Sequence, residues 1–267
     1  MRARVMTWNL WWQFGPWRER QQAILSTIAA EQPDIVCVQE VFEAEGGLDQ
    51  AQWLADELGF YVVRTQGPWY DGISFGNAIL SRWPIARWNE HRLPGPDGSA
   101  GHRRVITAQV DTPFGLCWVA CTHLDHKFDA STTRIAQCEA LCAVIDALRE
   151  DPENEMPVLL AGDFNSVPDS EEMRMMTGRR EPAIEGLVFT DAWEIAGEGL
   201  GFTWRRDNPY IADSTWPNRR LDYIFVSWPR PRPLGNPLRV WLAGVEPMHG
   251  VQPSDHAAVV ADIQMVD

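Results

Sequence analysis

The feature that most constrains the fold is an apolar run leading directly into a polar cluster, Val158-Leu159-Leu160-Ala161-Gly162-Asp163-Phe164-Asn165. After Pro157, the apolar residues predict a buried strand, and Gly162 loosens the backbone at its end. Asp163 and Asn165 are two residues apart, so an extended backbone points both side chains to the same side. Because Asp, Asn and Gly also form turns, a plain turn is the alternative interpretation.

The same pattern, an apolar strand with a polar residue at one end or early in its run, recurs through the chain. The polar residues are Asn9, Glu40, His123, Asp163 with Asn165, Asp222, and Asp255 with His256. A buried carboxylate or amide needs a cation, a proton or hydrogen-bond partners. Carboxylate and amide oxygens suit Mg²⁺ or Mn²⁺, and a His beside an Asp is the arrangement of an oriented general base. Taken singly, turn caps and surface acids are the alternatives.

Strands and helical patterns along the chain predict an α/β fold. The predicted strands are 4–10, 34–40, 60–64, 77–81, 85–91, 104–111, 116–123, the run from 158, a strand near 188, 221–226, 239–245 and 257–261. The predicted helices are about 17–32, 48–58, 131–149 and a short one at 170–177. Residues 112–115 predict a hairpin turn. We find no repeat and no dividing linker, so we expect a single domain over residues 1–267.

Composition bounds the function. The chain has 267 residues, of which 45% are apolar, enough for a sizeable core. With 23 basic and 37 acidic residues the net charge is −14, which disfavours tight, non-specific DNA binding but leaves room for a local basic groove. Five cysteines without a CxxC pattern are expected to be core residues in a reducing compartment. We see no signal-peptide profile and no transmembrane run, and therefore expect a soluble cytoplasmic protein.

Residues 202–220 form the one basic, aromatic-rich segment of this acidic chain. Trp204, Arg205 and Arg219 in that segment, together with Arg103, are the candidate substrate-binding residues. Arginine and tryptophan suit a substrate that carries phosphate and a flat or apolar group. The alternative is a solvated loop with scattered arginines.

The polar residues favour one reaction class over others. His123, Asp125 and His126 could suggest zinc, but such crowded ligands need distant partners to close a site. We find no Walker loop and no GxSxG or HExxH motif. The set of carboxylates, amides and imidazoles therefore points to metal-assisted hydrolysis of a phosphate ester.

An ordered set of short motifs resembles the endonuclease/exonuclease/phosphatase superfamily across essentially the whole chain. The motifs are Thr7-Trp8-Asn9, Val38-Gln39-Glu40, Gly76-Asn77-Ala78-Ile79-Leu80-Ser81, Thr122-His123, Gly162-Asp163-Phe164-Asn165, Leu221-Asp222-Tyr223 and Ser254-Asp255-His256. The resemblance implies a four-layered α/β sandwich with two mainly antiparallel sheets face to face and helices outside. It also implies Mg²⁺-dependent phosphoester cleavage, with Mn²⁺ as a substitute ion.

The resemblance also implies roles for the metal-site residues. Glu40 would be the principal metal ligand, with Asn9 beside it, and Asp255 would be a nearby or direct ligand.

For the reaction itself, the resemblance implies five catalytic residues. His256 would be the general base or a phosphate-contacting imidazole, oriented by Asp222. His123 and Asn165 would bind phosphate oxygens. Asp163 would position or deprotonate the attacking water, or assist the leaving group.

The motifs leave the substrate open. We expect a phosphodiesterase or phosphatase acting on a small-molecule or lipid-headgroup phosphate. The alternatives are a nuclease of the same fold, with Arg103 and Arg104 as a local phosphate track, and a catalytically inactive binding module. Repair nucleases of the superfamily place a tyrosine near the phosphate, for which Tyr70 is a weak candidate. No obligate protein partner is evident.

Overall fold

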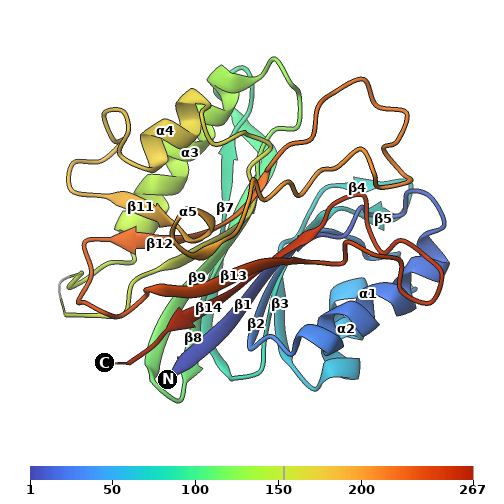
Figure 1. Ribbon diagram of the computed structural model, residues 1–267, viewed down its shortest axis with the longest axis horizontal. Coiled ribbons are helices and arrows are strands. Elements are labelled where there is room, and N and C mark those ends of the chain that lie inside the picture. Colours follow the sequence, from blue (N-terminus) through green and yellow to red (C-terminus); the bar gives the residue numbers. More distant parts are fainter. Residues whose placement is uncertain (153, 267) are drawn as a thin grey trace.

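Two sheets of six strands each lie face to face, with helices on both outer sides, in a computed structural model that describes residues 1–152 and 154–266 (Figure 1). The first sheet has the order β13 (Pro237–Ala243), β14 (Ala258–Gln264), β1 (Arg2–Asn9), β2 (Ile35–Val41), β6 (Gly76–Ser81) and β3 (Tyr61–Arg64). The second has the order β11 (Val188–Asp191), β12 (Asp222–Trp228), β10 (Leu159–Asp163), β9 (Gly115–His123), β8 (Ala100–Thr112) and β7 (Ile85–Pro94). The predicted α/β sandwich is confirmed.

Side-chain alternation along the strands builds the layers. In β1, Val5 packs between the two sheets, whereas Met6 and Trp8 pack on the opposite face, against α1 (Trp17–Glu31) and α2 (Gln50–Leu58). The outer face of the second sheet packs in the same way against α3 (Ser131–Asp146) and α4 (Glu171–Met176). Strands that are apolar on both faces therefore become central strands, because a helix layer and a second sheet cover them.

Each sheet contains one parallel pair at its centre, and its other pairs are antiparallel. The parallel pairs are β1 with β2 and β9 with β10. The carboxyl ends of two parallel neighbours meet at one edge of a sheet. Polar residues that follow these strands in sequence are thereby brought together in space.

The predicted elements are confirmed, with shifted boundaries that have local causes. Helix α1 ends at Glu31 because Gln32 takes a left-handed conformation, φ 51°, and Pro33 cannot continue a helix. The turn at 112–115 joins β8 to β9 as predicted. Strand β8 starts at Ala100, earlier than predicted, because the Gly/Pro-rich residues 95–99 form a hairpin turn instead of ending the sheet.

A short hairpin and a short helix were not predicted. The hairpin of β4 (Trp69–Tyr70) and β5 (Ile73–Ser74) turns at Asp71 and Gly72, which have φ values of 48° and 77°. Positive φ at both turn residues is the geometry that Asp-Gly favours, so this dipeptide was the available signal. Helix α5 (Ala192–Ala196) has Asp191 as its N-cap, accepting from the Trp193 backbone N–H.

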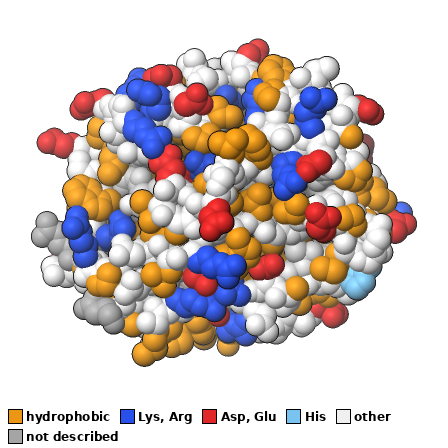
Figure 2. Space-filling view, in the orientation of Figure 1, with side chains coloured by type: hydrophobic (Ala, Val, Ile, Leu, Met, Phe, Trp, Pro, Cys, Tyr) orange, Lys and Arg blue, Asp and Glu red, His pale blue; other side chains and the backbone are white. Residues whose placement is uncertain are grey.

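All five cysteines are buried and free, as expected for core thiols. In the described part of the chain, no helix is both long and apolar enough to cross a membrane. On the face seen in Figure 2, basic and acidic side chains are interspersed. Although the chain carries a net negative charge, this face therefore also presents positively charged side chains.

A buried arginine fixes the loop that follows β1. Arg20, fully buried on α1, donates to the backbone oxygens of Leu10, Trp11, Trp12, Phe14 and Pro253 at distances of 2.7 to 3.1 Å. Burial lowers the pKa of its guanidinium to about 10, so it stays charged at neutral pH. One cation therefore ties the loop after β1 to the segment that precedes β14.

We predict that Arg20→Leu lowers the free energy of unfolding by about 3 kcal/mol or more, because buried carbonyls lose a charged donor. Arg18→Leu is the matched control, since Arg18 is exposed on the same helix, and it should change the free energy by about 0.5 kcal/mol or less. Urea unfolding followed by circular dichroism measures both. A loss of less than about 1 kcal/mol for Arg20→Leu would contradict the anchoring role.

Candidate active site

The carboxyl ends of the two parallel pairs supply the first polar residues of the site. Asn9 ends β1 and Glu40 lies near the end of β2, while His123 ends β9 and Asp163 ends β10. The facing sheets place both ends in one region: Asn9 Nδ2 donates to Glu40 Oε1 (3.2 Å) in its own sheet and to Asp163 Oδ2 (3.0 Å) in the opposite sheet. The amide of Asn9 therefore links the two sheets at the site.

The remaining polar residues arrive at the same edge on antiparallel strands. Asp222 begins β12 and pairs in register with Asp163 of β10. Asp255 and His256 precede β14, the antiparallel neighbour of β1. Their loop is fixed on β1, because Ser254 Oγ donates to the Asn9 backbone oxygen at 2.6 Å.

Asp163 lies at the centre of the polar cluster. Besides accepting from Asn9, its Oδ2 atom lies 3.5 Å from His123 Nε2 and 4.0 Å from His256 Nε2. Its Oδ1 atom accepts from the Asn165 backbone N–H at 2.9 Å. Burial, then the charge of Asp222, raises the pKa of Asp163 to about 6. Above that pH it is a carboxylate able to accept a proton.

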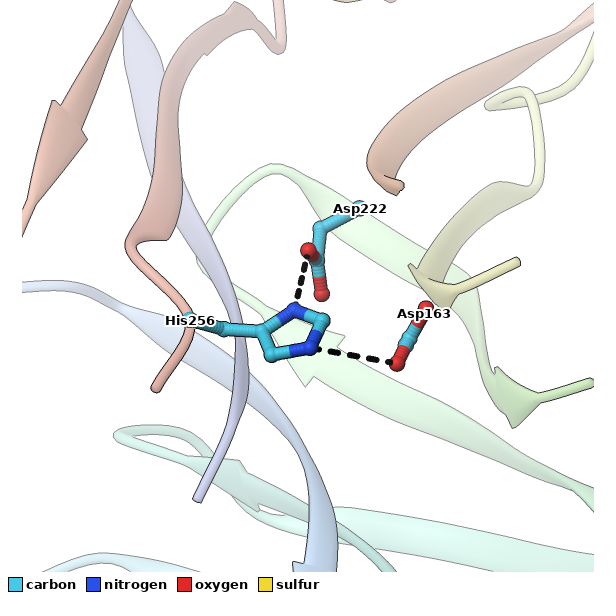
Figure 3. A group of neighbouring side chains, drawn as sticks. All are labelled: Asp163, Asp222 and His256. Carbon is cyan, nitrogen blue, oxygen red and sulfur yellow. Dashed lines mark hydrogen bonds and ion pairs between the residues drawn. The ribbon is translucent and has the colours of Figure 1, made fainter. Parts of the chain in front are cut away.

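His256 and Asp222 form a buried ion pair, with His256 Nδ1 2.8 Å from Asp222 Oδ2 (Figure 3). Figure 3 also shows the opposite ring edge directed at Asp163. Burial by itself lowers the pKa of His256, but the carboxylates of Asp222, Asp255 and Asp163 together outweigh it and raise the pKa well above its ordinary value. His256 is therefore held as an imidazolium, oriented by Asp222.

Glu40 reaches the cluster through an irregularity in β2. The pairing of β2 with β6 shifts register between Gln39 and Val41, and Glu40 between them has φ 57°. A bulge of this kind redirects a side chain at a sheet edge. Trp11, Trp12 and Asn165, which flank the same site, are also left-handed, with φ of 58°, 36° and 50°. Strained backbone thus surrounds this site, as it often does functional sites.

The surroundings of Glu40 fit a divalent cation. Its Oε2 atom is buried without a hydrogen-bond partner in the described residues. Burial, then the charges of Asp255 and Asp163, raises the pKa of Glu40 to about 7. Burial also raises the pKa of Asp255. Crowded carboxylates with an oxygen left over are the hard donor set that binds Mg²⁺ or Mn²⁺.

A second grouping of potential ligands competes with Glu40. One potential ligand atom from each of Asp163, Asp222 and His256 lies within 4.8 Å of the others, and Asp222 Oδ1 is buried without a partner in the described residues. However, His256 Nδ1 and Asp222 Oδ2 already bind each other. An ion held by Nδ1 would have to break that ion pair, and an ion held by Nε2 would have to displace a proton from an imidazolium whose pKa is raised. Glu40 is therefore the better candidate.

His123 and Asn165 are placed beside Asp163 as neutral groups. Burial, then the charge of Arg103, lowers the pKa of His123 well below its ordinary value, so the imidazole is neutral at pH 7. Asn165 Nδ2 donates to the Leu124 backbone oxygen at 3.2 Å, which fixes the amide. Both side chains therefore present fixed dipoles next to the central carboxylate.

The predicted substrate-binding residues separate into different environments. Arg103 lies near the cluster and lines a cavity together with Glu40. The backbone of Trp204 pairs with that of Arg219 and with that of His256 in single β-bridges. The Arg219 guanidinium lies over the rings of Phe128 and Trp216.

Arg205 is engaged elsewhere. It donates to Asp207 at 2.9 Å, and this hydrogen bond raises the pKa of its guanidinium. Among the described residues, no hydrogen bond or ion pair joins Arg205 to the polar cluster.

We predict that Asp222→Asn lowers the pKa of His256 and weakens its proton affinity by at least about tenfold. The variant removes a carboxylate that raises this pKa, while the burial that lowers it remains. Asp207→Asn is the control, since it removes an exposed carboxylate outside the cluster. The ring C–H signals of His256 followed by NMR against pH, in protein kept with a chelator, give both values. An unchanged pKa in Asp222→Asn would contradict the assigned ion pair.

Comparison with known proteins identifies the family of this chain. A sequence profile of the Endonuclease/Exonuclease/phosphatase family matches residues 6–256. Nocturnin of Xenopus laevis is 26% identical over 275 residues, covering 92% of this chain and 64% of its own length. The chain thus spans somewhat less than two thirds of that relative.

Solved structures share the fold. The human Nocturnin catalytic domain with bound sulfate aligns with TM-score 0.75 and 24% identity, covering 98% of this chain and 93% of that one. D. rerio TDP2 complexed with a single-strand DNA product aligns with TM-score 0.74 and 20% identity, covering 98% and 99%. The profile match includes every polar residue of the cluster, from Asn9 to His256, and the chain therefore belongs to the endonuclease/exonuclease/phosphatase family.

Proposed function

We propose that this protein hydrolyses a phosphodiester by water attack assisted by Mg²⁺, with Mn²⁺ as a substitute. The observation that carries the proposal is Glu40, whose buried Oε2 has no partner in the described residues and whose pKa is raised to about 7 by burial and neighbouring carboxylates. Family membership supports phosphoester hydrolysis as the reaction class. The metal requirement and the preference for a diester go beyond what family membership supports and are our proposal.

Glu40, Asn9 and Asp255 would hold the cation. Glu40 and Asp255 supply carboxylate oxygens, and the Asn9 amide, bonded to Glu40, holds that carboxylate in place. A bound divalent cation supplies positive charge for the phosphate oxygens and favours ionisation of water. It would also favour the ionised forms of Glu40 and Asp255, whose pKa values are raised chiefly by burial.

Asp163 is our candidate for the general base. With a pKa of about 6 it is ionised at neutral pH, yet basic enough to take a proton from the attacking water. His256, held as imidazolium by Asp222, would direct its Nε2 proton toward a phosphate or leaving-group oxygen. The opposite charges of the two side chains support this division of roles.

His123, Asn165 and Arg103 would bind the remaining phosphate oxygens. His123 is neutral and Asn165 is fixed by Leu124, so both can donate without changing charge. Arg103 brings a full positive charge. Donors fixed before the substrate arrives stabilise the charge that develops during the reaction.

A nuclease activity is the second candidate. The TDP2 structure was solved with a single-strand DNA product, and this chain shares its fold. Against a long nucleic acid stands the net charge of −14, with acidic groups interspersed among the basic ones in Figure 2. We therefore favour a short or small diester.

We also propose that residues 1–267 act as one domain, because the polar cluster draws on both sheets. The five buried free thiols support a reducing compartment, and we place the enzyme in the cytoplasm on that basis.

A substrate panel tests the proposal. Purified protein with Mg²⁺, Mn²⁺ or chelator is given a generic phosphodiester, a phosphomonoester, DNA, RNA and sphingomyelin, with Glu40→Ala as the blank. We expect metal-dependent cleavage of the small diester. Cleavage that persists in chelator or in Glu40→Ala would contradict the proposal, and cleavage of nucleic acid alone would favour the second candidate.

We predict that Asp163→Asn and His256→Ala each lower kcat by about 10²-fold or more, as for groups that act in the transition state. Asp169→Asn, at an exposed position six residues beyond Asp163 in the sequence, is the matched control and should keep wild-type kcat. Steady-state kinetics on the diester measure all three. A loss below tenfold in both test variants would mean that the roles are misassigned.

We predict that metal binding tightens as pH rises. Below pH 7 Glu40 is largely protonated, and its proton competes with the cation. The Mg²⁺ concentration needed for a fixed rise in Tm should therefore fall by about tenfold between pH 6 and pH 8. Thermal unfolding with graded Mg²⁺ measures it, and Glu40→Gln should lose most of the effect. A required concentration that is independent of pH would contradict the assignment of Glu40.

A further inference from the structure

A cavity of about 510 Å³ opens beside the polar cluster, with Glu40 and Arg103 among its lining residues. We call it the aromatic pocket, because its walls include Trp12, Phe14, Tyr70 and Phe75. Pro94, at the end of β7, and Gly95 and Pro96, in the turn to β8, also line it. A ligand held at the cluster therefore meets an open cavity with four aromatic side chains in its walls.

The walls of the aromatic pocket are fixed to the site. The Trp12 backbone N–H donates to the backbone oxygen of Glu40 at 3.1 Å, and the Trp12 indole N–H donates to the backbone oxygen of Ser74 at 2.7 Å. Trp12 thereby joins the loop after β1 to the β4–β5 hairpin. Phe75 packs on Trp12 and on His123, with ring centroids 6.1 and 5.9 Å apart. A group bound in the pocket would thus lie next to a phosphate at His123.

Arg103 is the one basic residue among the described charged residues that line the aromatic pocket, the others being Glu40 and Asp125. Its Nη2 atom donates to His126 Nδ1 at 3.2 Å, while its Nη1 atom is buried without a partner in the described residues. Its guanidinium lies 5.9 Å from the centre of the Phe75 ring. An unpaired guanidinium favours a phosphate beside the aromatic walls. Beside Phe75, the same guanidinium repels a quaternary ammonium group, the other ligand that aromatic cages attract.

We propose that the aromatic pocket binds the nucleobase of a nucleotide whose phosphate lies between Arg103 and the polar cluster. This rests on the proposed phosphodiesterase function and adds the substrate class. Flat aromatic walls stack on a planar base, and about 510 Å³ accommodates one nucleoside but not two acyl chains. A net charge of −14 opposes a long polyanion, so a mononucleotide ester or dinucleotide fits best.

Two esters with the same leaving group test the proposal. The p-nitrophenyl ester of thymidine monophosphate and methyl p-nitrophenyl phosphate are both diesters, and only the first carries a base. In the presence of Mg²⁺, we expect kcat/KM for the thymidine ester to exceed that for the methyl ester by about tenfold or more, because stacking of the base on aromatic side chains contributes binding energy of that size.

Tyr70 and Trp69 provide a matched pair of variants. They are neighbours on β4 with exposed fractions of 52% and 49%, but only Tyr70 lines the pocket. Both are exposed enough that an alanine should not unfold the protein. We expect Tyr70→Ala, and more strongly Tyr70→Ala combined with Phe14→Ala, to bring the ratio of the two esters toward one. Trp69→Ala should leave it unchanged.

The outcomes distinguish a failure of the nucleobase assignment from a failure of the proposed phosphodiesterase function. If both esters are cleaved at similar rates, or if Trp69→Ala lowers the ratio as much as Tyr70→Ala, the pocket does not bind the base, although the phosphodiesterase function stands. If neither ester is cleaved above the Glu40→Ala blank, the proposed function itself fails. If p-nitrophenylphosphorylcholine is cleaved in preference to the thymidine ester, the pocket takes a quaternary ammonium group and the nucleobase assignment is overturned.

Discussion

The burial of several carboxylates at one place is the constraint on which this site depends. Glu40, Asp163 and Asp255 lie where the two sheets meet at one edge, and burial raises the pKa of each. Neighbouring carboxylates add to the rise: Asp255 and Asp163 at Glu40, and Asp222 at both Asp163 and Asp255. The fold makes this unavoidable, because the parallel pairs β1–β2 and β9–β10 both end there. The cluster is partly offset by the imidazolium of His256 and, in our proposal, by a divalent cation at Glu40. Binding of the cation would therefore relieve an unfavourable charge that the folded protein carries.

The loop after β1 connects this electrostatic centre to the rest of the site. Arg20 holds the loop by its carbonyl groups, which leaves Trp11 and Trp12 in left-handed conformations. Trp12 in turn is bonded to the backbone of Glu40 and to the β4–β5 hairpin. The residues that would bind the metal and those that would bind a base are thus parts of one rigid assembly. Such preorganisation is what a site needs in order to stabilise charge without rearranging.

Much of the arrangement could be predicted from sequence, because strand periodicity and strand-end residues are local patterns. Asn9, Glu40, His123, Asp163, Asp222 and His256 were singled out on that basis, and the structure brings them together. The roles assigned to them stay predictions. The aromatic pocket was not foreseen, because it joins the loop after β1, the β4–β5 hairpin and the β7–β8 turn, which are distant in sequence. Arg20 was missed as well, although its spacing of four from Ile24 places it on the buried stripe of α1.

The position of the metal decides whether Glu40 or the pair of His256 and Asp222 holds it. Crystals of the protein grown with Mn²⁺ would locate the ion by its anomalous scattering, without reliance on a substrate. We expect a single strong peak within coordination distance of a Glu40 carboxylate oxygen, with the ion pair between His256 Nδ1 and Asp222 intact, and loss of that peak in Glu40→Gln. A peak coordinated by His256 Nδ1 and Asp222 in place of Glu40, or no ion bound at the cluster at all, would contradict this expectation.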